Sequence, residues 1–316
     1  MGIAGSIGTP FRAAIKTPTQ PSRTHELLDD VAFLPELGLY VGTTKVGRQL
    51  LRVAIRPGPA SAPVPRRPLL LFNGIGANLE LAAGFMARLE GVESVIFDVP
   101  GTGGSPSPWL PYRPWMIARL AARLMDQLGY AEIDVFGVSW GGGMAQQFAA
   151  QYPRRCRKLV LAATSMGSVM IPGNPKVYLN MVSPKRYIDK GFMRRVAPEL
   201  YGGDVRTDPK ALAQHVDGLR GGDRYGYLLQ LLAMMGWTSL PILWRIRQPT
   251  LILAGSDDPL VPPINARIMA RLLPRARLQM IDCGHLFIAT RAEQVARIVG
   301  DFLKPVGTTS RPSGGD

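Results

Sequence analysis

Cysteine and histidine are scarce in this chain, whose 316 residues include two cysteines and three histidines. Cys156 and Cys283 lie far apart and in no metal-ligand spacing, which argues against a disulfide framework and a structural zinc site. No apolar run reaches the roughly 18 residues that a membrane-spanning helix needs. Residues 1–24 also lack the continuous apolar core and cleavage site of a secretory signal. We therefore expect a cytoplasmic protein with no metal ion and no membrane span.

Signals for nucleic-acid and nucleotide binding are missing too, although the net charge is +14. The basic run at 154–158 is accompanied by no zinc-finger, RNA-binding or helix-turn-helix signature, so we expect no nucleic-acid partner. The glycine-rich segment 98–105 lacks the Lys-Ser/Thr ending of a phosphate-binding loop. The charge instead predicts a preference for negatively charged surfaces.

Short β-rich runs alternate with longer helical runs, which predicts an α/β fold with a mostly parallel central sheet flanked by helices. The composition, 46% hydrophobic and 19% charged, is that of a globular protein. The expected strands are 48–56, 69–74, 94–100, 133–139, 158–164, 250–256 and 277–282. The expected helices are 78–90, 114–129, 141–152 and 291–304.

One connection is much longer than the others and predicts an inserted domain. Roughly 80 residues with helical patterns separate the strands that end near 164 and begin near 250, far more than an ordinary connection. We assign 166–246 to a helical cap, and 48–165 with 247–305 to the core. Residues 1–47 are expected to form a partly disordered N-terminal extension, and 306–316 a disordered tail.

The sharpest chemical signal is the segment Gly137-Val138-Ser139-Trp140-Gly141, which lies between a predicted strand and a predicted helix. This G-x-S-x-G pattern is typical of a nucleophile elbow, a turn so tight that the flanking positions must be glycine. The elbow lifts a serine above the sheet edge and places the next backbone N–H beside it. Ser139 is therefore the candidate nucleophile, and the N–H of Trp140 a candidate oxyanion donor.

A serine nucleophile needs a base, and His285 is the candidate because it follows the last predicted strand on a loop. We expect His25, in an unstructured segment, and His215, within a cap helix, to be structural or exposed to solvent. The acid that orients the imidazole must be Asp257 or Asp258, which both follow the strand 250–256, and we favour Asp258.

The second oxyanion donor is expected from the loop 72–78, which follows an early strand. Its glycines allow close approach of the backbone to a substrate; the N–H of Ile75 is the candidate donor, and Asn73 would brace the loop. The cap is rich in methionine and aromatic residues, which suits an aliphatic ligand or packing on the sheet equally well. The substrate-binding residues expected from these patterns are Asn73, Gly74, Trp140, Met166 and Trp237.

With these motifs in place, the chain resembles the α/β-hydrolases, and more narrowly the intracellular depolymerases of medium-chain-length poly(3-hydroxyalkanoate). The resemblance spans roughly 48–304 and is carried by FNGIGANLEL, FDVPGTGGS, GVSWGGGMAQQFA, YPRRCRKLVLAAT, YGG, GWTS, QPTLILAGSDDPLVPPIN and DCGHLFIATRAE. It implies a serine esterase without a cofactor that cleaves a stored polyester to 3-hydroxy acids or oligomers through an acyl-enzyme. The triad that it implies is Ser139, Asp258 and His285, and the polymer granule surface is a candidate partner.

Three other functions fit parts of the sequence. A soluble carboxylesterase or carbon–carbon bond hydrolase would share the fold and the triad, since neither encodes the substrate. A polymer synthase of this architecture would resemble the chain but carries cysteine at the elbow, where position 139 is serine. A non-catalytic scaffold that binds granules or ligands would not need all three triad positions to be filled.

Overall fold

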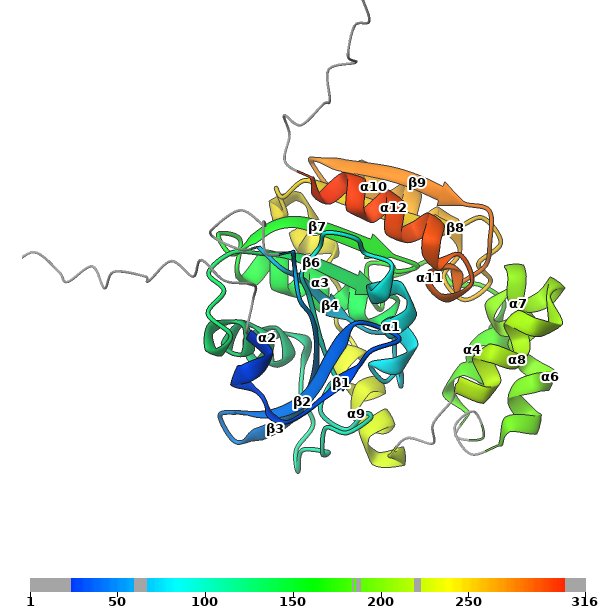
Figure 1. The fold of residues 1–316 in the computed structure, drawn as a ribbon. Coiled ribbons are helices and arrows are strands. Elements are labelled where there is room, and N and C mark those ends of the chain that lie inside the picture. The colour runs from blue at the N-terminus through cyan, green and yellow to red at the C-terminus, as the bar shows by residue number, and fades with distance from the viewer. Residues whose placement is uncertain (1–23, 60–66, 184, 186–188, 219–222, 305–316) are drawn as a thin grey trace, which may run out of the picture.

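The computed structural model describes residues 24–59, 67–183, 185, 189–218 and 223–304, and its centre is a sheet of nine strands (Figure 1). The strand order is β1-β2-β3-β5-β4-β6-β7-β8-β9. The pairs β1–β2, β2–β3 and β3–β5 are antiparallel, and every pair from β5 to β9 is parallel. The predicted mostly parallel α/β fold is therefore confirmed. The strands are β1 (Asp29–Leu34), β2 (Leu39–Val46), β3 (Gln49–Arg56), β4 (Leu69–Phe72), β5 (Ser94–Phe97), β6 (Ile133–Val138), β7 (Cys156–Ala162), β8 (Thr250–Gly255) and β9 (Ala276–Ile281).

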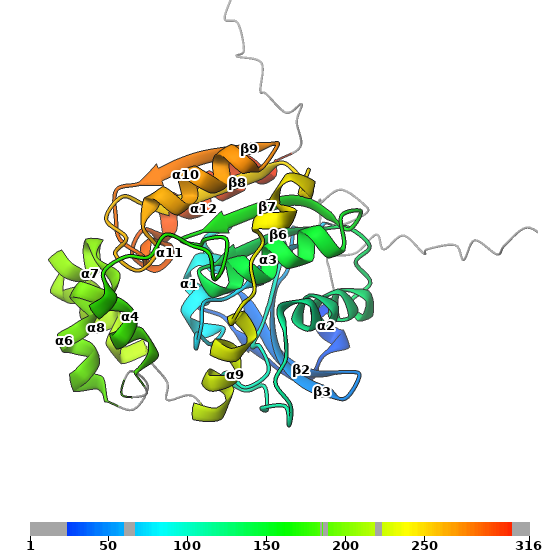
Figure 2. The same ribbon diagram turned by 180° about the vertical axis from the view of Figure 1, so that it is seen from behind.

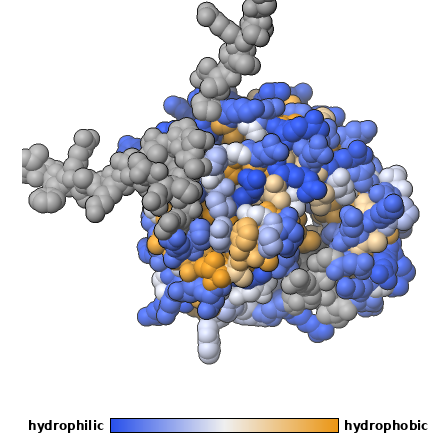
Figure 3. Space-filling view, viewed as in Figure 1, coloured by the Kyte–Doolittle hydropathy of each residue, from blue (hydrophilic) through white to orange (hydrophobic). Residues whose placement is uncertain are grey.

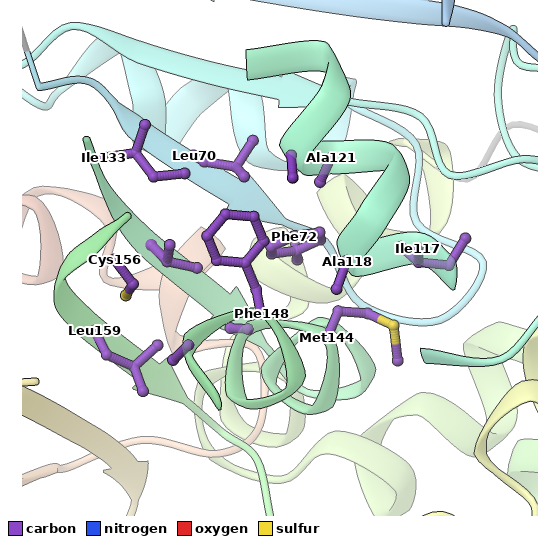
Figure 4. Packing of buried hydrophobic residues seen from close by; sticks show 14 of the residues in the cluster. Leu70, Phe72, Ile117, Ala118, Ala121, Ile133, Met144, Phe148, Cys156 and Leu159 are labelled. Carbon is purple, nitrogen blue, oxygen red and sulfur yellow. The ribbon is translucent and has the colours of Figure 1, made fainter. Parts of the chain in front are cut away.

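Helices cover both faces of the sheet, as Figures 1 and 2 show from opposite sides. One face carries α1 (Glu80–Ala87), α11 (Phe287–Thr290) and α12 (Ala292–Leu303). The other carries α2 (Pro114–Gln127), α3 (Trp140–Gln151) and α10 (Pro263–Leu272). Figure 4 shows the packing on this second face, where Phe72 of β4 lies against Phe148 of α3. A buried apolar cluster therefore lies on each face of the sheet.

The segment predicted as a cap lies between β7 and β8, which pair in parallel in the sheet. Its helices α4 (Pro175–Val182), α6 (Lys190–Tyr201), α7 (Gly203–Thr207) and α8 (Pro209–Gly218) lie together to one side of the sheet (Figure 1) and share their own apolar cluster. In contrast, α9 (Arg224–Met234) and the 3-10 helix η2 (Leu240–Arg245) pack against the main core through Leu229, Ala233 and Leu243. The segment predicted as one cap thus has two differently packed parts.

The N-terminal boundary of the core differs from the expected residue 48, because β1 and β2 already belong to the sheet. The edge strand β1 is exposed along almost its whole length, so it has no apolar alternation that would reveal it in the sequence. His25, expected in an unstructured segment, lies in the 3-10 helix η1 (Thr24–Leu27) and stacks on Tyr40 with ring centroids 3.6 Å apart. Residues 1–23 and 305–316, predicted to be partly disordered, lie outside the described residues.

Most of the surface in Figure 3 is hydrophilic, and apolar side chains gather over β1, where Val31 and Phe33 are exposed. Both cysteines are free and buried. Within the described ranges, no helix combines the length and apolarity needed to cross a membrane.

Candidate active site

The nucleophile elbow connects β6 to α3 and holds Ser139 in a strained backbone conformation, with φ 53° and ψ −119°. The positions two residues before and after Ser139 must be glycine, because a side chain there would clash with the backbone. A Cβ at Gly137 would lie 2.4 Å from the carbonyl oxygen of Gly141, and a Cβ at Gly141 would lie 2.2 Å from that of Phe72. The carbonyl of Ser139 accepts from the hydroxyl of Thr164 at 2.7 Å, and the N–H of Ser139 donates to the carbonyl of Ala162 at 2.9 Å. The end of β7 and the residues that follow it therefore fix the strained turn.

Ser139, His285 and Asp258 form one continuous chain of hydrogen bonds. His285 Nε2 lies 3.1 Å from Ser139 Oγ, and His285 Nδ1 lies 2.7 Å from Asp258 Oδ2. Because a carboxylate can only accept, Nδ1 carries the proton and Nε2 is left to accept from the serine hydroxyl. His285 and Asp258 are each 4% exposed, so water barely reaches the pair. This arrangement can activate a serine for attack on a carbonyl carbon.

Asp258 and its neighbour Asp257 point to different partners. The second oxygen of Asp258, Oδ1, accepts from the backbone N–H groups of Leu260 and Val261 at 2.9 and 2.8 Å, which fixes the carboxylate behind the imidazole. Asp257 is exposed and accepts from Arg206 of α7 at 2.9 Å and from the N–H of Gly203 at 2.8 Å. Of the two acids left open by the sequence, Asp258 is the one in hydrogen-bond contact with His285.

The loop after β4 lies beside the nucleophile and offers one amide to a substrate. A Cβ at Gly74 would lie 3.8 Å from Ser139 Cβ. Asn73 braces the loop, because its amide donates to the carbonyl of Asn78 at 2.7 Å and its oxygen accepts from the N–H of Gly74 at 3.0 Å. Within the described part of the chain, the N–H of Ile75 has no hydrogen-bond acceptor, and Ile75 lines the pocket at Ser139. Ile75 therefore remains the candidate second oxyanion donor.

Gln230 of α9 ties this loop to the elbow, and nothing in the sequence marked it. Its side-chain oxygen accepts from the N–H of Gly76 at 2.6 Å, and its carbonyl accepts from the indole N–H of Trp140 at 2.9 Å. The residue is 1% exposed. A glutamine within a helical pattern carries no functional signal, so only the packing of α9 onto the core reveals its contacts.

The pocket around Ser139 is mainly apolar, and its walls come from the core as much as from the cap. Asn73 and Gly74, two of the candidate substrate-binding residues, line it. The core supplies Leu71, Phe72, Ala82, Phe85, Ile96, Phe136, Val138 and Ile288, and the cap supplies Met181, Tyr201 and His215. His215, expected to be structural or exposed, is half-buried at the pocket, edge-on to the ring of Tyr201 with centroids 4.8 Å apart.

Three expected substrate contacts lie elsewhere in the structure. The side chains of Trp140, Met166 and Trp237 do not line this pocket. Trp140 and Met166 are 7% and 3% exposed within the main core, and the indole of Trp237 donates to Gln147 of α3 at 3.0 Å. The physical reason is that the segments around Met166 and Trp237 pack on α3, so these apolar residues serve packing.

The described residues contain no group of three or more His, Cys, Asp or Glu side chains that could hold a metal ion. The glycine-rich segment 98–105 also has a structural explanation. The carboxylate of Asp98 accepts from the N–H groups of Leu79 at 2.7 Å and Gly104 at 2.9 Å. These bonds tie the segment to the end of the loop 72–78, which we call the oxyanion loop. The segment thus helps to hold the loop that lies beside Ser139.

The chain is similar to several known proteins. The model of the α/β hydrolase fold family matches residues 67–216 and 222–292. The chain is 52% identical to "Poly(3-hydroxyalkanoate) depolymerase" of Ectopseudomonas oleovorans, over 83% of this chain and 92% of that protein. It is 30% identical to the pimeloyl-[acyl-carrier protein] methyl ester esterase of Aromatoleum aromaticum, over 76% and 99% of the two chains. The crystal structure of the enol-lactonase from Burkholderia xenovorans LB400 is 25% identical and superposes with a TM-score of 0.72, over 83% and 99% of the chains. The chain therefore belongs to the α/β-hydrolase family and, within it, to the family of the poly(3-hydroxyalkanoate) depolymerase of E. oleovorans.

Proposed function

We propose that this protein is a serine esterase that hydrolyses the ester bonds of poly(3-hydroxyalkanoate) in the cytoplasm, releasing 3-hydroxy acids or oligomers. The observation that carries the proposal is the buried contact of Ser139 with His285 and of His285 with Asp258, in a chain 52% identical to a depolymerase of that polymer. The apolar lining of the pocket suits the aliphatic groups of such a polyester.

In the proposed mechanism, Ser139 Oγ attacks the ester carbonyl carbon while Nε2 of His285 takes its proton. The N–H groups of Trp140 and Ile75 hold the oxyanion, and a donor of this kind contributes about 3 kcal/mol to lowering the barrier. His285 then gives the proton to the leaving alkoxide, which departs as an alcohol and leaves an acyl group on Ser139. Water, deprotonated by the same imidazole, attacks this ester and frees the carboxylic acid.

Asp258 holds the imidazole in the tautomer with the proton on Nδ1 and stabilises the imidazolium that forms in each half-reaction. Because His285 and Asp258 are nearly inaccessible to water, this charge–charge contact acts in a medium of low dielectric constant, where it is stronger than at the surface. No step in this sequence draws on a cofactor.

Product analysis on purified medium-chain polymer tests the proposal. We expect the wild type to release 3-hydroxy acids or short oligomers, and Ser139→Ala to release them several orders of magnitude more slowly. Turnover of p-nitrophenyl esters without any attack on the polymer would instead identify a soluble carboxylesterase. A Ser139→Ala variant that keeps the wild-type activity would exclude the serine mechanism and revive the non-catalytic scaffold.

We further propose that the enzyme meets the polymer at the granule surface. Trp109 and Leu110 are 96% and 77% exposed, on a loop held to α9 by a hydrogen bond from the Tyr225 hydroxyl to the Trp109 carbonyl at 3.0 Å. Large exposed apolar side chains on a braced loop suit contact with an aliphatic surface. The net charge of +14 offers a second route, through an anionic granule coat.

Co-sedimentation with granules at low and high salt separates the two routes. Loss of binding in Trp109→Ser/Leu110→Ser at every salt concentration supports the apolar route. Binding that falls as salt rises supports the electrostatic one, because salt screens exposed charges. Absence of the wild type from the granule pellet at both salt concentrations would refute the association.

A further inference from the structure

The pocket at Ser139 continues past the oxyanion loop into the core, between the sheet and α1. Its inner walls are Leu71 of β4, Ile96 of β5 and Phe136 of β6, faced by Ala82 and Phe85 of α1. These strands are adjacent in the sheet order β5-β4-β6, and all five residues lie in the apolar cluster on the α1 face. We call this part of the pocket the inner chamber.

The walls of the inner chamber are apolar, and water barely reaches them. None of its five lining residues is more than 6% exposed, although all of them border the empty space of the pocket. A polar group placed between these aliphatic and aromatic side chains would lose its hydrogen bonds to water. The natural occupant of the chamber is a saturated hydrocarbon chain.

We propose that the inner chamber binds the alkyl side chain of the acyl group carried by Ser139, and that Ala82 and Phe85 limit the length of that chain. The proposal rests on the proposed function, because it needs an acyl group at Ser139. It places chain-length selection in α1 and the sheet, and not in the methionine-rich cap.

Two features make Ala82 and Phe85 the residues that set the length. Phe85 packs against Phe136 with ring centroids 5.1 Å apart, so the aromatic wall is fixed by a neighbour and cannot swing aside freely. Ala82 lies three residues earlier, on the same face of α1, and its methyl group leaves the space that a chain would occupy. A larger residue at position 82 would fill the chamber, and a smaller one at position 85 would extend it.

The cap residues of the pocket suit the rest of the polymer. Met181, Tyr201 and His215 of the cap also line the pocket, so this wall contains polar as well as apolar side chains. A 3-hydroxyacyl unit branches at its third carbon into an alkyl arm and an oxygen that continues the main chain. The apolar chamber matches the alkyl arm, and the mixed cap wall matches the ester oxygen.

The test is the chain-length profile of kcat/KM on p-nitrophenyl esters from C4 to C12, measured for the wild type, Ala82→Leu and Phe85→Leu. Each CH₂ that enters the chamber should raise kcat/KM about fourfold until the chamber is full. We expect Ala82→Leu to move the optimum two to three carbons shorter and to lower kcat/KM for the longest esters at least tenfold. Phe85→Leu should move the optimum to longer esters.

Matched controls on buried residues outside the pocket separate the chamber from general damage to the core. Ala83→Leu makes the same change on α1 at a residue 3% exposed, and Phe148→Leu removes the same ring from the opposite face of the sheet. Neither residue lines the pocket, so both controls should keep the wild-type profile. Because the two chamber variants change the space in opposite directions, either one that folds, as judged by thermal melting, is sufficient for the test.

An unchanged profile in a folded chamber variant, or an equal shift in its control, would overturn the proposal. Parallel incubation of the wild type with the polymer keeps this result separate from the proposed function. If the wild type releases products from the polymer and the ester profile of the variants is unchanged, only the chamber proposal is refuted. If the ester profile shifts and no product is released from the polymer, the chamber is supported and the depolymerase function is refuted.

Discussion

The backbone N–H of His285 donates to the carbonyl oxygen of Tyr201 at 2.7 Å, so the last residue of cap helix α6 holds the loop that carries the imidazole. The segment after α6 and the loop that carries His285 cross in direct backbone contact. A Cβ at Gly203 would lie 1.9 Å from the backbone nitrogen of Gly284, a distance that no side chain tolerates. The position of His285 therefore depends on how the cap is docked.

Two ion pairs connect helix α7 of the cap to core residues near this crossing. Arg206 of α7 pairs with Asp257 at 2.9 Å, next to the candidate triad acid. Asp204 of α7 pairs with Arg291, just after α11, through two bonds of 2.7 Å, and this pairing lowers the pKa of Asp204. Together with the Tyr201 bond, these contacts couple the docking of α7 to the geometry of the imidazole.

The first prediction concerns Asp257. Asp257→Ala removes the partner of Arg206 and the acceptor for the N–H of Gly203, so α7 should dock less firmly and His285 should sample unproductive positions. Exposed ion pairs contribute only up to about 1 kcal/mol to stability. We therefore expect a three- to tenfold lower kcat on a soluble ester, with little change in the melting temperature.

A suitable control for Asp257→Ala is Asp217→Ala, which breaks an exposed ion pair with Arg194 inside the cap, away from His285. Steady-state kinetics on one soluble ester should show a lower kcat for the first variant only. Equal losses in both variants would mean that His285 does not depend on the Asp257 contact.

The second prediction concerns Asp258. Asp258→Asn keeps the size of the side chain but removes the charge that selects the Nδ1–H tautomer of His285 and stabilises the imidazolium. We expect kcat to fall by about 10⁴-fold, while KM changes little. Asp257→Asn, one residue away, is the matched control and should stay within tenfold of the wild type. Comparable kcat values for the two variants would rule out Asp258 as the orienting acid.

The arrangement around Ser139 could be predicted from the sequence because each part follows from local chemistry or from sheet geometry. The glycines at 137 and 141 reflect a steric demand of the elbow itself. In a parallel sheet the carboxyl ends of the strands meet at one edge, so the loops after β6, β8 and β9 come together. The structure brings Ser139, Asp258 and His285 into contact there, and their catalytic roles stay predictions for the kinetics to test.

The pocket walls and the first strands could not be predicted, because they depend on packing between distant segments. Apolar residues such as Met166 and Ala82 look alike in sequence. Only the packing of the Met166 segment on α3 and of α1 on the sheet decides which of them borders the pocket. The strand β1 is an exposed edge without alternation, so its pattern resembles a loop. Gln230 and Tyr201 act through contacts with residues more than 80 positions away.

The third prediction concerns Asn73, whose side chain bridges the two ends of the oxyanion loop. Asn73→Ala removes the donor to Asn78 and the acceptor for Gly74, so the N–H of Ile75 should lose its fixed direction. Displacing one oxyanion donor costs about 3 kcal/mol, which corresponds to a kcat about 10²-fold lower, with KM changed far less. An Asn73→Ala enzyme that retains the wild-type kcat on a soluble ester would show that this brace is dispensable.

The last prediction concerns Asp98, a carboxylate 1% exposed that accepts from Leu79 and Gly104 and lies 3.4 Å from Arg52. Asp98→Asn leaves one of the two buried N–H groups facing an amide NH₂, and Arg52 loses part of its countercharge. An unsatisfied buried donor costs about 1–3 kcal/mol, so the free energy of unfolding in urea should fall by about that amount. Asp126→Asn, at an exposed acid paired with Arg155, should leave the unfolding midpoint nearly unchanged.

Burial also raises the pKa of Asp98 in the folded state above its ordinary value, which gives this residue a characteristic pH dependence. A carboxyl whose folded pKa is raised binds its proton more tightly when folded, so its contribution to stability is lost as pH rises through the folded pKa. Lowering the pH from 7 toward about 4 should therefore widen the stability gap between the wild type and Asp98→Asn, which has no proton to bind. A gap that narrows over this range would mean that the hydrogen bonds and Arg52 outweigh burial and lower the pKa of Asp98.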